Sequence, residues 1–148
     1  MSPGDIQLRE AKASDADFIY QVVETTMRAY VEQIWGSFSE EYNQKNIAES
    51  IAAGIYSIIR FDGQEIGALA VERHSTHIQL TQMYIRPSHQ NRGIGTWLVR
   101  ELAREAKESG RPLRLRVLSV NPARRLYERE GFRVISTTPE RVFMELHA

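Results

Sequence analysis

A glycine-bearing loop at residues 90–95, with the sequence Gln-Asn-Arg-Gly-Ile-Gly, is the segment best suited to binding a ligand. It follows a strand-like run at residues 78–85 and leads into a helix-like run that begins near Ile94. The first N–H groups of a helix lack intrahelical partners, and the helix dipole adds partial positive charge there. Gly93 and Gly95 carry no side chain, so a phosphate can approach the main chain itself. The loop therefore indicates an anion site, although glycines at such a junction can also serve only to turn the chain.

Two common phosphate-binding motifs are absent, which narrows the kind of ligand. The loop has neither the nucleotide pattern that ends in Lys-Ser/Thr nor the longer dinucleotide fingerprint. The chain has no cysteine, and its four histidines lack the spacing that places two zinc ligands on one helix face. We therefore expect a phosphate-bearing ligand other than a nucleoside triphosphate or a nicotinamide dinucleotide, and no metal.

Composition is that of an ordinary globular protein. The 148 residues are 42% hydrophobic and 26% charged, which predicts a single domain over residues 1–148. Basic and acidic residues number 19 each, so no net charge favours nucleic acid as a partner. No apolar run reaches membrane-spanning length and no secretory signal begins the chain, so we expect no membrane partner and a cytoplasmic location. Whether the protein forms a homodimer is left open.

Strand and helix patterns alternate along the chain. Asp62-Gly63 is a strong hairpin signal, Ser14 and Ser39 are expected N-caps, and Asn121 with Pro122 is expected to start the last helix. Strands are expected at residues 6–9, 55–61, 64–73, 77–85, 113–117, 132–135 and 141–146, and helices at residues 14–34, 39–54, 94–110 and 121–131. The order β-α-α-β-β-β-α-β-α-β-β predicts an α/β fold with a mixed, mostly antiparallel sheet flanked by helices.

Four motifs along the second half of the chain carry a resemblance. They are Met83-Tyr84-Ile85-Arg86-Pro87, Gln90-x-x-Gly93-x-Gly95, Asn121, and Leu126-Tyr127-Glu128-x-x-Gly131-Phe132. Together they resemble the GCN5-related N-acetyltransferase (GNAT) family, whose element order also matches nearly the whole chain. The resemblance implies a transferase with acetyl-CoA as acyl-donor cosubstrate. Its acceptor would be a primary amine of a small molecule or peptide, attacking directly without a covalent acyl-enzyme.

The resemblance also assigns residues to the cofactor. Loop N–H groups would hold the coenzyme pyrophosphate, and the backbone of a strand that splays from its neighbour would pair with the pantetheine amides. The loop residues are Asn91, Arg92, Gly93, Ile94, Gly95 and Thr96, and the strand residues are Met83, Tyr84 and Ile85.

Tyr127 and Asn121 are the other two residues that the family pattern assigns. A phenol can protonate the departing thiolate, so Tyr127 is the catalytic candidate, the alternative being a helix residue with its hydroxyl in water. Asn121 would bond the pantetheine arm or simply cap a helix. Its separation from Tyr127 is one position shorter than the family's commoner spacing.

The acceptor side departs from the family pattern. Ribosomal-protein N-terminal acetyltransferases, which the chain resembles, place a glutamate where this sequence has Arg116, and an arginine cannot act as general base. The base candidates are then Glu24, Glu72 and His77, or solvent through a water chain. A guanidinium at this position favours an acceptor that carries a carboxylate near its amine, the alternative being that Arg116 points into solvent or pairs with a nearby glutamate.

Aromatic residues at the join of the first two helices could line the acceptor pocket or belong to the core. They are Tyr30, Trp35, Phe38 and Tyr42. With Arg116, Tyr30 and Trp35 are the substrate-binding candidates. Two alternatives to an enzyme remain open at this point: a coenzyme A-binding or sensor module without turnover, and an interaction protein in which the glycine loop is only structural.

Overall fold

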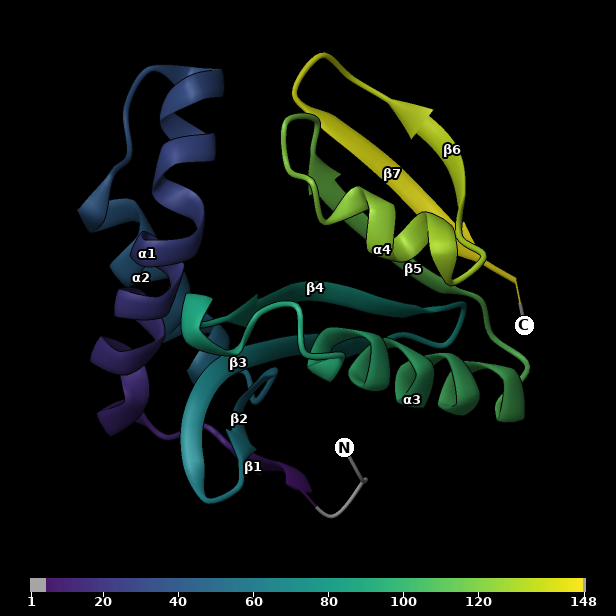
Figure 1. The fold of residues 1–148 in the computed structure, drawn as a ribbon, viewed down its shortest axis with the longest axis horizontal. Coiled ribbons are helices and arrows are strands. Elements are labelled where there is room, and N and C mark those ends of the chain that lie inside the picture. Colours follow the sequence, from purple (N-terminus) through teal and green to yellow (C-terminus); the bar gives the residue numbers. More distant parts are fainter. Residues whose placement is uncertain (1–4, 148) are drawn as a thin grey trace. The chain divides into compact units, whose positions relative to one another are not determined.

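The computed structural model describes residues 5–147, so residues 1–4 and 148 of the expected domain lie outside it. Its helices are α1 (Ala16–Trp35), α2 (Glu40–Ala52), α3 (Ile94–Glu108) and α4 (Arg124–Arg129). Its strands are β1 (Ile6–Glu10), β2 (Tyr56–Phe61), β3 (Gln64–Arg73), β4 (Ile78–Ile85), β5 (Leu113–Leu118), β6 (Arg133–Thr137) and β7 (Arg141–Leu146). The predicted α/β class and element order are confirmed (Figure 1).

The strands form one sheet in the order β1-β2-β3-β4-β5-β7-β6. β4 runs parallel to β5, whereas the β1–β2, β2–β3, β5–β7 and β6–β7 pairs are antiparallel, as expected for a mixed, mostly antiparallel sheet. The chain divides into two compact units, Met1–Ala70 with Gln82–Ile94 and Val71–Thr81 with Gly95–Ala148. Strands β3 and β4 contribute to both units.

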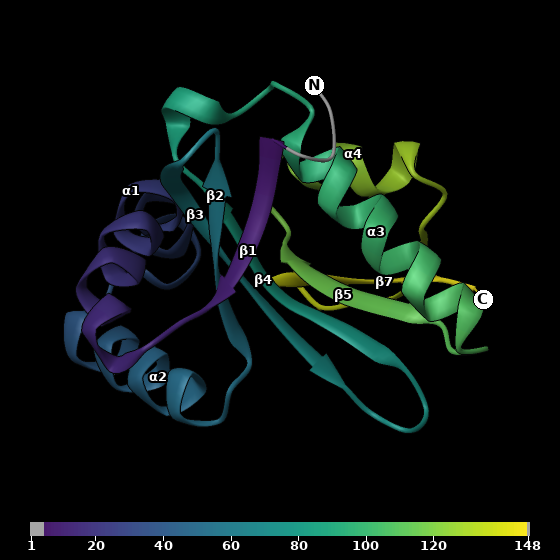
Figure 2. The same ribbon diagram turned by 90° about the horizontal axis from the view of Figure 1, so that it is seen from below.

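The first unit has a core between helices α1 and α2 and its strands. Ile19, Val22 and Val23 of α1 are buried with Ile47 of α2 against Ile58 of β2, and Phe38 packs on the same cluster. Figure 2 shows the two helices together on one side of β2 and β3. The hairpin at Asp62-Gly63 is confirmed, because both residues have positive φ, 53° and 83°, as a tight two-residue turn requires.

Serine capping is confirmed for one of the two helices. The Ser39 hydroxyl accepts a hydrogen bond of 3.0 Å from the Tyr42 N–H at the start of α2. The expected Ser14 cap of α1 is wrong. A 3-10 turn, Ala13–Asp15, comes first, and Asp15 is the N-cap of α1. The Asp15 carboxylate accepts the Lys12 N–H and pairs with Arg9 of β1 at 2.8 Å, so a tertiary contact fixes the helix start.

The second unit buries one face of β5. Leu113, Leu115 and Val117 are buried, whereas Arg114 and Arg116 alternate with them on the opposite face. Helices α3 and α4 lie together on one side of β5 and β7 (Figure 2). The expected helix start at Asn121-Pro122 is wrong: α4 begins at Arg124. The Asn121 side-chain oxygen instead accepts the Ala123 N–H at 2.9 Å, which forms a turn ahead of the helix.

Candidate functional site

The glycine loop has a backbone that suits an anion. A short 3-10 turn, Pro87–His89, precedes it, and the Gln90 side-chain amide donates a hydrogen bond of 2.8 Å to the Ile85 carbonyl. Asn91 and Gly93 have positive φ, 61° and 83°, a conformation that favours glycine. Helix α3 then begins at Ile94, as predicted, so its first N–H groups follow the loop directly. These features fit a phosphate group held by main-chain N–H groups.

Strand β4 carries the next group of predicted cofactor residues. Its parallel pairing with β5 joins Ile78–Leu80 to Leu113–Leu115, and Met83, Tyr84 and Ile85 lie further along β4, beyond these pairs. On its other side β4 lies very close to β3. A Cβ on Gly67 would lie 2.0 Å from the Tyr84 carbonyl oxygen, and the Arg86 N–H donates to the Ile66 carbonyl at 2.8 Å. Gly67 therefore allows the position that this part of β4 adopts.

Tyr127 is buried on α4. Only 5% of the residue is exposed, and its ring meets that of Phe132 edge-on at 5.7 Å. Burial raises the pKa of its phenol to about 12, because the charged form is disfavoured away from water. Within residues 5–147 its hydroxyl has no hydrogen-bond partner. The phenol is thus neutral at ordinary pH, and most of the side chain is shielded from water.

A pocket of about 360 Å³ opens on the face of the second unit that carries Arg114 and Arg116. Residues of β3, β4, β5, β6 and β7 line it, among them Glu72, Thr81, Arg114, Arg116, Ile135 and Phe143. It brings together one base candidate, Glu72, and one substrate-binding candidate, Arg116.

The two arginines of this face differ in their partners. Arg114 is half-buried and its Nε lies 2.7 Å from Glu145 Oε2. Arg116 is exposed and makes no ion pair with any residue of the described part of the chain. Glu72 accepts a hydrogen bond of 3.0 Å from the Thr81 hydroxyl, and its other oxygen lies 3.7 Å from His74.

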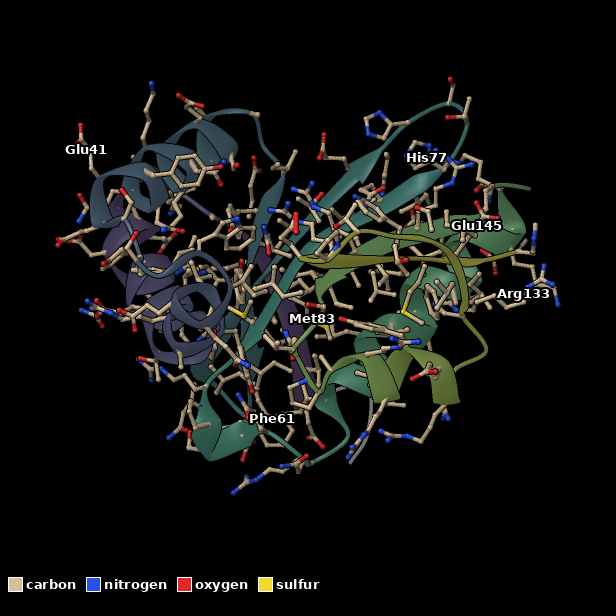
Figure 3. The ribbon with its side chains drawn as sticks, turned by 90° about the horizontal axis from the view of Figure 1, so that it is seen from above. Glu41, Phe61, His77, Met83, Arg133 and Glu145 are labelled. Carbon is tan, nitrogen blue, oxygen red and sulfur yellow. The ribbon has the colours of Figure 1, made fainter. Side chains whose placement is uncertain are left out.

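The other two base candidates lie outside this pocket. Glu24 belongs to the first unit, where it pairs with Arg28 at 3.0 Å. His77 precedes β4 and stacks on His74 at 4.8 Å, and burial lowers the pKa of its imidazole. Figure 3 shows His77 at the turn before β4 and Glu145 on β7 at the same end of the second unit.

The aromatic residues near the join of α1 and α2 separate into two groups. Phe38 belongs to the core, with its ring 6.3 Å from that of Tyr20. Tyr30 is half-buried on α1, and Trp35 and Tyr42 are 47% and 66% exposed. Trp35 is the last residue of α1, one position beyond the expected end of this helix.

Sequence reasoning missed Gly67, Thr81 and Phe143. A lone glycine within a strand pattern was a signal for Gly67, because it often marks close approach of another backbone. Thr81 and Phe143 carried no local signal, since only the strand order places them beside Arg116. No group of three or more histidine, aspartate or glutamate side chains in residues 5–147 could hold a metal ion. In the same residues, each helix is too short or too polar to span a membrane.

Comparison with known proteins gives a family and a fold. A family model of the acetyltransferase (GNAT) domain matches residues 52–134. No curated protein matches the sequence. Among solved structures, the PaiA N-acetyltransferase from Thermoplasma acidophilum in complex with coenzyme A has a TM-score of 0.77 and 21% identity, with both chains fully covered.

Two further structures have the same fold. An acetyltransferase from Thermus thermophilus has a TM-score of 0.77 and 17% identity over 97% of each chain. Arabidopsis thaliana Naa50, in complex with the bisubstrate analogue CoA-Ac-MVNAL, has a TM-score of 0.70 and 14% identity, covering 97% of this chain and 99% of its own. At these identities the similarity concerns the fold.

Proposed function

The chain belongs to the GNAT family of N-acetyltransferases, which take the acetyl group from acetyl-CoA, and we propose that it acetylates a primary amine by direct attack, without a covalent acyl-enzyme. The observation that carries the proposal is the family match over residues 52–134, which contains both the glycine loop and Tyr127. Residues 1–148 are taken as one such domain, because β3 and β4 run through both compact units.

We assign the coenzyme to the loop and to β4. The N–H groups from Asn91 to Thr96, including those of Arg92, Gly93, Ile94 and Gly95, would hold the pyrophosphate. The positive φ of Gly93 and the start of α3 at Ile94 support this assignment.

The backbone of Met83, Tyr84 and Ile85 would pair with the pantetheine amides in the manner of an added strand. The β4–β5 pairing, Ile78–Leu80 with Leu113–Leu115, lies before these residues on β4, which supports this role. Asn121 is assigned to the same arm, and its side-chain oxygen accepts a hydrogen bond from the Ala123 N–H.

When bound, acetyl-CoA supplies the acetyl group: a new C–N bond replaces the thioester C–S bond, and the free coenzyme A thiol leaves. Tyr127 donates its phenolic proton to the departing sulfur and recovers one from the acylated nitrogen. Its raised pKa of about 12 keeps that proton on the phenol before the reaction. Neither step needs a nucleophile from the protein, so no acyl-enzyme is required.

The acceptor amine would belong to a small molecule or a peptide. The chain shares its fold with Naa50, whose structure contains CoA-Ac-MVNAL, and this supports including peptides among the candidate acceptors. Tyr30 and Trp35 remain acceptor-side candidates on α1, and Arg116 is one in the second unit.

Two measurements test the proposal. The first is the thermal shift with acetyl-CoA, since a ligand that binds only the folded state raises Tm. The second is free-thiol release over a panel of amines, amino acids and peptides. A thermal shift with no thiol release from any acceptor would favour a non-catalytic coenzyme A module. The absence of both the thermal shift and thiol release would refute the assignment altogether.

A further inference from the structure

Four residues form a row across one face of the sheet in the second unit. Thr81 of β4 and Arg116 of β5 each follow directly after Leu80 and Leu115, which pair in the parallel ladder. Arg116 faces Phe143 of β7 in the antiparallel ladder, and Thr81 bonds Glu72 of β3. All four line the pocket of about 360 Å³.

The row carries one charge of each sign. Within residues 5–147 neither Glu72 nor Arg116 pairs with an arginine, lysine, aspartate or glutamate, and His74 Nε2 lies 3.7 Å from Glu72 Oε1. Glu72 and Arg116 lie on strands separated by β4, so their backbones are about 10 Å apart at the usual strand spacing. They make no ion pair with one another, and the second arginine of the pocket, Arg114, is neutralised by Glu145. A carboxylate and a guanidinium thus face the same small pocket from its two sides.

Apolar side chains line one side of the pocket, whereas His74 and Gln79 also contribute to its lining, and the space is limited. Ile135 of β6 and Phe143 of β7 line the side of the pocket beyond Arg116. A volume of about 360 Å³ is at the lower end of the range for ligand pockets. A ligand that complements this site has a cation, an anion and a small apolar group.

We propose that the acceptor is a free α-amino acid with an apolar side chain, bound as the zwitterion, with Arg116 holding its carboxylate and Glu72 its ammonium group. This inference rests on the acetyltransferase function proposed above. The Arg116 guanidinium matches a carboxylate through two parallel hydrogen bonds. Glu72, oriented by Thr81, takes the ammonium proton, and the neutral nitrogen then attacks the thioester carbon.

The test uses a matched series of acceptors: leucine, leucinamide and 3-methylbutylamine, which share the apolar group and differ at the carboxylate. Thiol release from acetyl-CoA gives kcat/KM for each. We expect Arg116→Ala to lower the value for leucine by about 10- to 150-fold, the range for a hydrogen bond to a charged group, and to leave the other two unchanged. The amines differ in basicity, so the decisive quantity is the change in their ratios between wild type and variant.

Control variants separate a specific role from a general loss of charge. Arg133→Ala removes an exposed arginine from β6, outside the pocket lining, and should leave all three values as in wild type. Arg116→Lys keeps the charge but loses the paired geometry, so it should recover only part of the leucine preference. Glu72→Gln should lower kcat for all three acceptors with acetyl-CoA affinity unchanged, whereas Glu108→Gln, at the exposed end of α3, should not.

The experiments distinguish failure of the amino-acid assignment from failure of the acetyltransferase function. A leucine-induced thermal shift in the presence of coenzyme A that disappears in Arg116→Ala supports carboxylate recognition without requiring turnover. Wild-type preference for leucinamide, the free amine or a peptide N-terminus, unaffected by Arg116→Ala, would overturn the amino-acid assignment while the transferase function stands. Thiol release from no amine at all would instead count against the transferase function.

Discussion

Gly67 offers a direct test of the role of β4 in binding the coenzyme. A Cβ at this position would lie 2.0 Å from the Tyr84 carbonyl oxygen, 3.1 Å from its carbonyl carbon and 3.2 Å from Ile85 Cα. All three are backbone atoms, so no side-chain rotation can relieve the clash. Since even close carbon–oxygen contacts are about 3.3 Å or longer, Gly67→Ala requires β3 and β4 to separate by about 1 Å or more.

Two effects of different size follow from that displacement. Overpacking of this kind commonly costs about 1–3 kcal/mol of folding stability. A shift of about 1 Å at a positioning element can cost about a hundredfold in function. Because Tyr84 and Ile85 are the residues that move, we expect acetyl-CoA affinity to fall by about tenfold or more in protein that is still folded.

Affinity is measured by calorimetric titration well below Tm, and stability by denaturant unfolding. Gly110→Ala is the matched control: its φ of 69° makes alanine strained, but no atom lies within 4 Å of the added Cβ. This variant should lose a comparable free energy of unfolding and retain its acetyl-CoA affinity. Wild-type affinity in folded Gly67→Ala would refute the assignment of the pantetheine arm to this part of β4.

Three further predictions follow from the loop, the phenol and the start of α1. Gly93→Glu should abolish acetyl-CoA binding, because a side chain and a negative charge would enter the pyrophosphate site from a residue with φ of 83°; titration of folded variant checks this. Tyr127→Phe should lower kcat by about 10²- to 10⁴-fold with little change in coenzyme affinity, and unchanged turnover would remove Tyr127 from the mechanism. Hydrogen bonding to Arg9 lowers the pKa of Asp15 to about 2, so its stabilising effect is complete above about pH 4 and is lost as the pH falls through about 2. After allowance for solvent screening this is about 1 kcal/mol, and acid unfolding of Asp15→Asn should show a flatter profile in that window.

Local signals predicted the fold well wherever a short segment determines its own conformation. Asp62-Gly63 forms its hairpin and Ser39 caps α2, since both depend on neighbouring residues alone. Ser14 and Asn121 were assigned to caps by the same logic, and both were wrong. Asp15 pairs with Arg9 on β1, and this tertiary contact fixes the start of α1. The Asn121 oxygen does accept the Ala123 N–H, but the residues that follow form a turn and α4 begins only at Arg124.

The candidate site was predictable in the same uneven way. Six consecutive residues are enough to predict the loop before α3, and the flanking motif is enough to single out Tyr127. The pocket could not be inferred, because its members come from five strands and meet only through register. Arg114 and Arg116 are alike in sequence, but Glu145 lies opposite one of them and Phe143 opposite the other. That difference decides which arginine retains an unneutralised charge.

Arg116 occupies the position on β5 where related N-terminal acetyltransferases have a glutamate, and the structure changes what this exchange implies. Considered along β5 alone, Arg116 in place of a carboxylate favours a module that binds coenzyme without turnover. Across the sheet, a carboxylate is still present in the same pocket, since Glu72 reaches it from β3 with Thr81 as its hydrogen-bond partner. A general base needs reach and orientation toward the amine rather than a given strand. The exchange leaves room for a base and adds a cation beside it, which favours a change of acceptor over a loss of catalysis.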